Sequence, residues 1–478
     1  MPHEDDKLKK RQEKREAQRR KRQAEARRLK LTAFVAIVAL IASGFGIYKL
    51  TQKPPAEESA QVQIEETKPQ EPKPTRPIDK DPITKIHIKA AGDLNVTTKV
   101  VDSGLAVSGY DYSPVFKDVA SILADADLTV MNFEGNICGE PYGSETTSAP
   151  VQLLSALRSC GVDMLQMANS CAINNGLNGL TSTLNAIRSA GMEPLGAYAT
   201  ANELRNSKGY TMTEIQGIKV AFVAFTKGLG GRGMPAGSEG LVNILYKDYA
   251  TTYKEVDKEG ITAILKNVAA EKPDITVAML HWGSEYNDDI SKTQNQIVSL
   301  MQENGVDVIL GTHPHTLQPI VFDEDAGTLV VYSLGDFFGD AVRGATNYSI
   351  ILDIEITQDA NAGTTRVTDY TLTPIYTVTE SESIGNHDRK VVRISKAIEA
   401  NQENFLDKIN DTCKANMEYA LVRIDQRVAT TVEVGCTGCK KTVEVLADKT
   451  GMLVTDATCK NCKTELKAGT SLKDYRKP

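Results

Sequence analysis

The sequence predicts an α/β fold on three observations. Seven short apolar segments lie in the middle of the chain, helix-like segments separate them, and nearly every apolar segment ends in a small polar cluster. Apolar runs with few charges are typical of strands buried in a parallel sheet, and strands that alternate with helices define the α/β class. Because ligands in open α/β sheets gather beyond the carboxyl ends of the strands, the polar clusters predict one site assembled from distant segments.

The seven predicted strands are followed by a change of pattern. The strands are 86–94, 127–135, 162–170, 219–228, 274–285, 306–315 and 329–337. Apolar residues at helical spacing predict helices within 113–126, 150–161, 180–191 and 291–305. Residues 349–357 and 366–378 alternate in polarity and are rich in β-branched residues, with no helix between them. This pattern predicts antiparallel strands that complete a second sheet or form an edge.

Length and charge place limits on the class of protein. A chain of 478 residues, 41% hydrophobic and 24% charged, can form a substantial core and more than one domain. The net charge is −7, yet residues 1–30 hold 13 Lys and Arg against 6 Asp and Glu. We interpret residues 1–30 as a basic cytoplasmic arm beside anionic lipid, and we expect no nucleic-acid partner.

Residues 31–50 predict a transmembrane helix. Leu31–Tyr48 is 18 residues long without a charge, and as a helix it spans roughly 27 Å, close to one bilayer core. The basic arm before it predicts a single span of the plasma membrane with the N-terminus inside and the main domain extracytoplasmic. A cleaved signal peptide is the alternative, although its basic region is normally shorter. Residues 51–82, rich in Pro, Glu, Lys and Gln, predict a disordered linker.

Acids, amides and histidines at the predicted strand ends are candidates for a divalent-metal site. Neutral imidazole is a common ligand of transition metals, and carboxylate and carbonyl oxygens suit divalent cations beside it. The candidate ligands are Asp93, Asn132, Glu134, Asn169, His281, His313 and His315. The alternative is a set of ordinary loop residues, with hydrogen-bonded histidines and a turn at the Gly-Asp pair.

Two further sets of residues are candidates for chemistry. In HWGSEY, His281 and Glu285 are candidate catalytic residues, although Glu285 could equally hold a ligand or form a surface ion pair. The only tryptophan, Trp282, is expected in the core. Lys227 and Arg232 flank or lie in a glycine-rich loop and are candidates for contact with an anionic substrate; a solvated surface loop is the alternative. This loop lacks the Gly-Lys-Ser/Thr of a phosphate-binding P-loop.

The polar clusters also resemble a known family. The series GD, N-x-E, AN followed by G, HWG-x-EY, G-x-HPH-x-x-Q and YSLG-x-F is similar to the CapA family of poly-γ-glutamate capsule proteins, from about Ile83 to Asp353. The resemblance implies a metallophosphatase-like fold for residues 83–380, with two sheets sandwiched between helices. It also implies a dimetal site, with Mn, Fe and Zn not distinguished, that uses Asp93, Asn132 or Glu134, Asn169, His281, His313 and His315.

The chain departs from the family pattern within ANSCAINNG. Cys171 stands where the family has a histidine near the leaving group, Asn174 replaces an aspartate, and Asp336 replaces an asparagine in the last element. A thiol is a poor proton donor near neutral pH, and an amide cannot orient a base as a carboxylate does. We expect Cys171 to be buried or bridged to another cysteine rather than to act as a nucleophile. The usual acid–base pair is therefore missing, and whether the chain is an enzyme stays open.

The C-terminal part predicts a separate small module. Residues 390–426 are charge-rich and periodic, which predicts a helical connector. In 427–478, two C-x-x-C pairs separated by nineteen residues predict a zinc-ribbon-like module with a hairpin between the pairs. Its structural zinc ligands are Cys436, Cys439, Cys459 and Cys462. Disulfides are the alternative, because the module is predicted to lie outside the membrane.

Three functions are compatible with these features. The first is a membrane-anchored protein that assists the synthesis or export of an anionic surface polymer of the poly-γ-glutamate type, with other capsule-synthesis membrane proteins as candidate partners. The second is an active metal-dependent phosphoesterase or amidase at the cell surface. The third is a non-catalytic interaction protein with a vestigial metal site.

Overall fold

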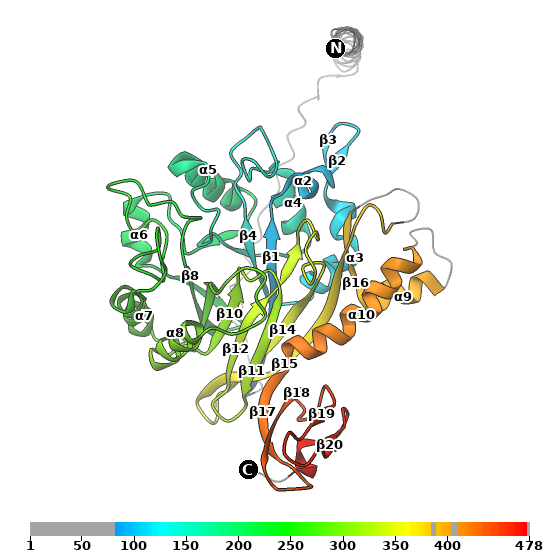
Figure 1. Cartoon of the computed structure of the whole chain (residues 1–478). Coiled ribbons are helices and arrows are strands. Elements are labelled where there is room, and N and C mark those ends of the chain that lie inside the picture. The colour runs from blue at the N-terminus through cyan, green and yellow to red at the C-terminus, as the bar shows by residue number, and fades with distance from the viewer. Residues whose placement is uncertain (1–81, 384–388, 403–408, 476–478) are drawn as a thin grey trace, which may run out of the picture. The chain divides into compact units, whose positions relative to one another are not determined.

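Two sheets form the centre of the fold (Figure 1). The computed structural model describes residues 82–383, 389–402 and 409–475. The first sheet contains, in spatial order, β16 (Lys390–Arg393), β15 (Thr364–Val378), β14 (Tyr348–Asp359), β1 (Ile83–Asn95), β4 (Leu128–Glu134), β5 (Met164–Gln166) and β6 (Glu193–Leu195), with β13 (Asp336–Phe338) beside β1. The second contains β11 (Leu317–Asp323), β12 (Thr328–Leu334), β10 (Val308–Thr312), β9 (Ile275–His281), β8 (Ile218–Thr226) and β7 (Thr211–Ile215).

Parallel pairing brings the carboxyl ends of the central strands together. β1, β4, β5 and β6 are parallel in the first sheet, and β8, β9, β10 and β12 are parallel in the second. All seven predicted apolar strands are confirmed. The two alternating segments after residue 349 form β14 and β15, which pair antiparallel and extend the first sheet beside β1. They therefore extend the first sheet on one side, with β16 outside them, and do not complete a second sheet.

The two sheets pack face to face, and β1 lies against β10 and β12. Alternation along β8 shows why its residues are apolar throughout. Val220, Phe222 and Ala224 belong to the core shared with the first sheet, whereas Ala221, Val223 and Phe225 face the cluster built with the helices of the second sheet. A strand covered on both faces has no polar side, as its sequence predicts.

Helices cover the outer faces of the sheets. α7 (Lys258–Glu271) and α8 (Lys292–Glu303) pack on the second sheet, and α8 begins at a capping box formed by Ser291 and Gln294. The other helices before the connector are α2 (Thr98–Asp102), α3 (Ser113–Ala124), α4 (Gln152–Ser159), α5 (Gly176–Ser189) and α6 (Ala201–Ser207). α3 packs on β16 and α5 on β6. The four helices predicted before the connector are thus present. A small hairpin of β2 (Leu105–Ala106) and β3 (Gly109–Tyr110) follows α2.

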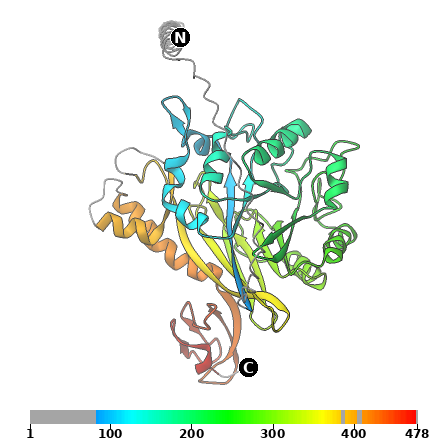
Figure 2. The same cartoon turned by 180° about the vertical axis from the view of Figure 1, so that it is seen from behind.

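The predicted connector forms two helices, α9 (Ile394–Gln402) and α10 (Asp411–Val428). Figures 1 and 2 show them on the opposite side from α6, α7 and α8. α10 contacts β11 as well as β14 and β15, so it touches both sheets.

The C-terminal module contains two hairpins around the C-x-x-C pairs, and the hairpin predicted between the pairs is present as a short reversal in which Ala447 bridges Leu453 in antiparallel fashion. β17 (Thr430–Gly435) pairs with β18 (Thr442–Ala447), and β19 (Ala457–Thr458) pairs with β20 (Glu465–Leu466); a short 3-10 helix, η1 (Leu472–Asp474), follows. Each C-x-x-C pair therefore lies in the turn of its own hairpin, where the reversal of the chain holds the two sulfurs close.

The predicted arm 1–30, transmembrane helix 31–50 and nearly all of the linker 51–82 lie outside the described residues. Among residues 82–383, 389–402 and 409–475, no helix has both the length and the hydropathy to cross a bilayer.

A bulge in β1 gives the fold its most constrained contact. The register of β1 shifts between Ala91 and Asp93, and the Asp93 amide donates to the Gly335 carbonyl at 2.9 Å. A Cβ on Gly92 would lie 1.8 Å from the same carbonyl oxygen. Gly335, at φ +71°, turns the chain between β12 and β13. The missing side chain of Gly92 thus lets β13 approach β1 and sets Asp93 opposite Asp336.

We predict that Gly92→Ala lowers the stability of the chain, because its methyl group forces the two strands apart. Overpacking against backbone costs about 3 kcal/mol, which lowers the melting temperature by roughly 5 °C. Gly233→Ala is the matched control, since a Cβ there meets no atom within 4 Å. Thermal unfolding of both variants checks this, and an unchanged melting temperature for Gly92→Ala contradicts the close approach.

Candidate metal centre

The structure brings all seven candidate ligands of the main domain to one place. They lie at or just beyond the carboxyl ends of β1, β4, β5, β9 and β10, and every one is at most 7% exposed. Asp336, at the start of β13, joins them. Residues separated by more than 200 positions therefore meet because parallel strands in both sheets end at the same edge.

Amide groups hold two of the carboxylates. The Asn132 amide donates to Asp93 Oδ1 at 2.6 Å and to Glu134 Oε1 at 3.2 Å. Asn132 and Glu134 face the same side because β4 stays extended through both. The Asn169 amide donates to Asn132 Oδ1 at 3.1 Å and to two backbone carbonyls, and Asn169 Oδ1 accepts from the backbone of Cys171. Asn169 thus braces Asn132.

His315 joins the carboxylates of two strands. Its Nδ1 lies 2.8 Å from Asp336 Oδ1 and 3.4 Å from Asp93 Oδ2. Burial alone lowers the pKa of His315, but Asp336, Asp93 and Glu134 outweigh it and hold the pKa well above its ordinary value. Burial in turn raises the pKa of Asp336 to about 7, against the pull of His315. Imidazole and carboxylate therefore share a proton when no other cation is near.

His313 has the least satisfied side chain of the cluster. Its Nδ1 is buried and has no hydrogen-bond partner. Burial, assisted by His281, Lys227 and His315, holds the pKa of His313 well below its ordinary value, so the ring is neutral. Its φ of +92° is strained for a non-glycine residue, and its backbone amide donates to Asp93 Oδ2 at 3.0 Å. Strain and a buried unpaired nitrogen together point to an interaction that is satisfied by a ligand.

His281 holds Glu134 in place. Its Nε2 lies 2.7 Å from Glu134 Oε1 and its Nδ1 lies 3.0 Å from Thr226 Oγ1. Burial opposes ionisation of Glu134, but the charge and hydrogen bond of His281 lower its pKa to about 2. Both ring nitrogens of His281 thus have hydrogen-bond partners. His313 and His315 each belong to a group of donor atoms that could hold a cation.

The donor atoms fit a divalent cation. Glu134, His313 and His315 offer one ligand atom each within 4.8 Å of one another, and so do Asp93, His315 and Asp336. Carboxylate oxygens with imidazole nitrogens suit Mn, Fe or Zn without selecting one. Positive charge at this point offsets the crowding of the three carboxylates.

Cys171 and Asn174 border this cluster. Burial, with the nearby charge of Glu134, raises the pKa of Cys171 to about 12, so its sulfur stays a thiol. All eight cysteines are free, so Cys171 is not bridged. Asn174 donates to Thr147 Oγ1 at 3.1 Å and accepts from Arg232 at 2.7 Å. Neither side chain is arranged as a proton donor and its orienting acid.

The remaining candidates are not among the side chains grouped around a possible cation position. Glu285 is exposed in the loop after β9. The Lys227 ammonium donates to the Gly283 carbonyl at 2.5 Å, and burial lowers its pKa. Arg232 is exposed and bonded to Asn174. Trp282 is fully buried and donates to the Tyr332 carbonyl at 2.9 Å, as expected for a core residue.

An open pocket of about 370 Å³ leads to the cluster. Glu134, His315 and Asp336 lie at its base, and Cys171 is part of its wall. Three residues here were missed by sequence reasoning: Asn95, Tyr286 and Arg343. Asn95 donates to Asp336 at 2.8 Å and lies two residues after Asp93, so the period of a strand gave a usable signal. Tyr286 and Arg343 lie in loops, where no sequence pattern indicated their role.

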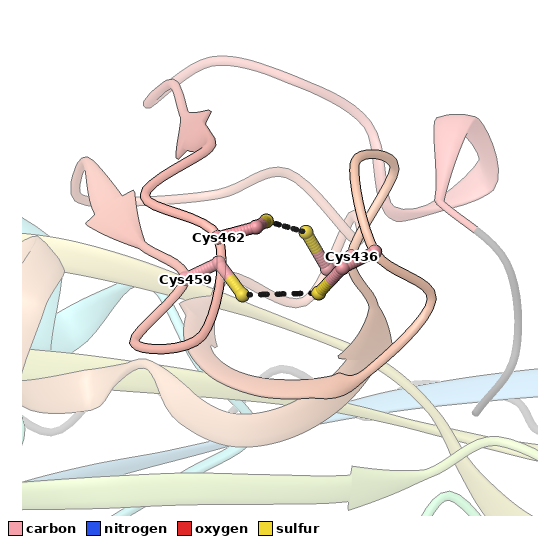
Figure 3. Close-up of side chains that lie close together, drawn as sticks. Cys436, Cys459 and Cys462 are labelled. Atoms are coloured by element: carbon pink, nitrogen blue, oxygen red, sulfur yellow. Dashed lines mark hydrogen bonds between the residues drawn. The ribbon is translucent and has the colours of Figure 1, made fainter.

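The four C-terminal cysteines form a second group with metal-ligand geometry. Figure 3 shows the sulfurs of Cys436, Cys459 and Cys462 directed inward from two turns. Sulfurs of Cys436 and Cys462 are 3.5 Å apart, and those of Cys439 and Cys459 are 3.6 Å apart. Tetrahedral zinc–thiolate geometry requires about 3.8 Å between sulfurs, whereas a disulfide requires about 2 Å. The spacing therefore fits four thiolates around one metal ion and not two disulfides.

Comparison with known proteins identifies the family. Residues 87–341, more than half of the chain, match the family model described as bacterial capsule synthesis protein PGA_cap. The chain is 27% identical over 267 residues to the PGA biosynthesis protein CapA of Bacillus subtilis (strain 168), which covers 55% of this chain and 64% of that protein. It is 24% identical over 285 residues to the capsule biosynthesis protein CapA of Bacillus anthracis, which covers 58% of this chain and 66% of that protein. The chain thus spans about two thirds of the length of each relative or slightly less.

Solved structures overlap only loosely. The calcineurin-like phosphoesterase YfkN of Bacillus subtilis is 18% identical with a TM-score of 0.38, over 71% of this chain and 100% of that chain. A phosphatase from Mycoplasma pneumoniae is 13% identical with a TM-score of 0.38, over 62% and 94%. Overlaps at this level support no statement about the chemistry of this chain. The family match over residues 87–341, which contains every candidate ligand of the main-domain cluster, places this protein in the bacterial capsule synthesis family PGA_cap, the CapA family.

Proposed function

We propose that this chain is a membrane-anchored, extracytoplasmic protein that assists the synthesis or export of an anionic surface polymer of the poly-γ-glutamate type. In this proposal a divalent-metal centre binds the polymer without hydrolysing it. The observation that carries the proposal is the pair of donor groups that share His315, Glu134–His313–His315 and Asp93–His315–Asp336, each with ligand atoms within 4.8 Å of one another. The names of the two Bacillus relatives support the polymer class. The basic arm 1–30 and the uncharged stretch within 31–50 support the anchor.

The residues proposed to hold the metal are Asp93, Glu134, His313, His315 and Asp336. A bound divalent cation supplies positive charge and Lewis acidity at the base of the pocket. The protein's own side chains fix this environment: His281 and Asn132 orient Glu134, and Asn95 orients Asp336. A polymer carboxylate that enters the pocket then meets a metal cation instead of carboxylates whose charge is only partly compensated.

Binding without turnover follows from the residues near the pocket wall. Cys171 is a protonated thiol, and Asn174 is bonded to Arg232 and Thr147. Neither supplies the positioned general acid that contributes about 100- to 10,000-fold to a hydrolytic rate. An active hydrolase and a protein with a vestigial metal site remain the two competing outcomes of the experiments below.

We predict that the full chain binds divalent metal in excess of the single ion that its four C-terminal cysteines can hold. His313→Ala and His315→Ala should weaken this additional binding at least about 10-fold, since each removes a ligand. His87→Ala is the matched control, because His87 lies near the start of β1 and pairs with Asp353. Elemental analysis of the purified variants measures the loss. Wild-type metal no greater than the ribbon can hold would eliminate the proposal.

We predict that Cys171→His/Asn174→Asp gains hydrolysis of a generic phosphodiester, by about 100-fold or more over wild type, because it restores an imidazole and its orienting acid. Cys171→Ala/Asn174→Asp is the control without the imidazole. If the restored variant stays inactive with metal bound, the account of the missing acid is wrong. Substantial wild-type turnover that His313→Ala abolishes would favour the hydrolase instead.

We propose that Cys436, Cys439, Cys459 and Cys462 hold one structural zinc. A site closed by four thiolates leaves no open coordination position, so its role is to stabilise the module. We predict that Cys459→Ser removes one zinc per chain and leaves the main-domain metal unchanged. Cys160→Ser, which changes a buried cysteine of the main domain, should keep the zinc. Thiol titration that finds two disulfides in place of four free thiolates contradicts the zinc assignment.

A further inference from the structure

Three side chains from separate loops form a stack at one wall of the pocket. The Tyr286 ring lies against His315, with centroids 5.3 Å apart and an interplanar angle of 29°. The Arg343 guanidinium lies over the same Tyr286 ring, 4.1 Å from its centroid. His315 belongs to both candidate metal groups. The stack therefore connects the cluster at the base of the pocket to a positive charge at its mouth.

Arg343 has no acidic partner among the residues that the structure describes. The guanidinium groups of Arg158, Arg188, Arg389 and Arg427 each form an ion pair with a carboxylate. Within the described residues, no carboxylate forms an ion pair with Arg343, although it lines a pocket that contains Glu134 and Asp336. Its five N–H donors are thus open to a ligand.

The loop that carries Arg343 is held at both ends. Arg389, which is buried, donates to the carbonyls of Gly339 at 3.0 Å and Asp340 at 2.9 Å. Thr346 Oγ1 donates to the Arg343 carbonyl at 2.8 Å. Tyr286 is anchored as well, because its backbone amide donates to the Pro314 carbonyl at 2.8 Å, between the two histidines of the cluster. The guanidinium is therefore presented from fixed backbone, which lowers the entropic cost of binding.

The other cations near the site are already engaged. The Lys227 ammonium bonds to the Gly283 carbonyl and lies 4.9 Å from the Tyr253 ring. Arg232 donates to Asn174. Neither is among the residues that line the pocket. Among the residues that line the pocket, Arg343 is therefore the one with an arginine or lysine side chain.

We infer that Arg343 is the residue that binds an oxyanion of the substrate at the mouth of the pocket, with Tyr286 as the platform that positions it. This inference rests on the proposed function, because it supplies the second positive contact for an anionic substrate whose other contact is the metal centre. A planar guanidinium recognises carboxylate and phosphate in the same bidentate manner, so the shared ligand chemistry is an oxyanion.

The test uses the full chain loaded with Mn²⁺ and two probes, a short γ-linked glutamate oligomer and inorganic phosphate. Calorimetry measures the affinity of each probe for wild type, Arg343→Gln, Arg343→Lys and Tyr286→Leu. Arg366→Gln is the matched control, since Arg366 lies on β15 and bonds only to the Glu324 carbonyl. Metal content is measured for every variant.

We expect Arg343→Gln to weaken binding of the oligomer roughly 10- to 100-fold, the size of a charge-assisted hydrogen bond, with metal content unchanged. Arg343→Lys should be intermediate, because it keeps the charge and loses the planar fork. Tyr286→Leu should weaken binding less than Arg343→Gln, and Arg366→Gln should match wild type. If the affinity falls for the oligomer alone, the ligand is a carboxylate; if it falls for phosphate alone, the ligand is a phosphate. Either result supports the inference.

Equal affinity of wild type and Arg343→Gln for both probes overturns the inference and leaves the proposed function intact. Loss of metal from Arg343→Gln also overturns it, since the residue would then act through the cluster. If metal-loaded wild type binds neither probe, the proposed function and the inference fail together.

Discussion

The convergence of Asp93, Glu134 and Asp336 at the edge of two sheets is the constraint on which the rest of the structure depends. Three carboxylates out of contact with bulk water are costly unless positive charge or hydrogen-bond donors compensate them. His315, His281 and the amides of asparagine side chains supply part of that compensation. His313, whose side chain belongs to the same group of donors, also has a buried Nδ1 without a hydrogen-bond partner. A divalent cation accounts for both features with one group.

The backbone adopts constrained conformations that support this arrangement. The absence of a side chain at Gly92 lets β13 approach β1, and His313 adopts a left-handed conformation. Parallel pairing in both sheets then determines which residues meet, because the carboxyl ends of β1, β4, β9 and β10 lie at one edge. The loops beyond those ends carry Cys171 and Asn174, which border the cluster.

The strands and the members of the cluster could be predicted from the sequence, because both depend on local patterns. Apolar runs that end in His313 or Asp93 are visible in the chain, and the α/β topology places their ends together. The contacts of Arg343 and Tyr286 could not be predicted, since each lies in a loop whose path depends on packing elsewhere. In the C-terminal module the reversal at 447–453 was predicted, but the pairing of β17 with β18 was not, because it involves a strand that precedes the first C-x-x-C pair.

An anomalous-scattering crystal structure of the Mn²⁺-soaked chain tests the central claim most directly. The account predicts anomalous density in the volume bounded by Asp93, Glu134, His313, His315 and Asp336, with His313 Nδ1 among the coordinating atoms. Density confined to the four C-terminal cysteines, with the ring of His313 bonded only to protein or water, would contradict it.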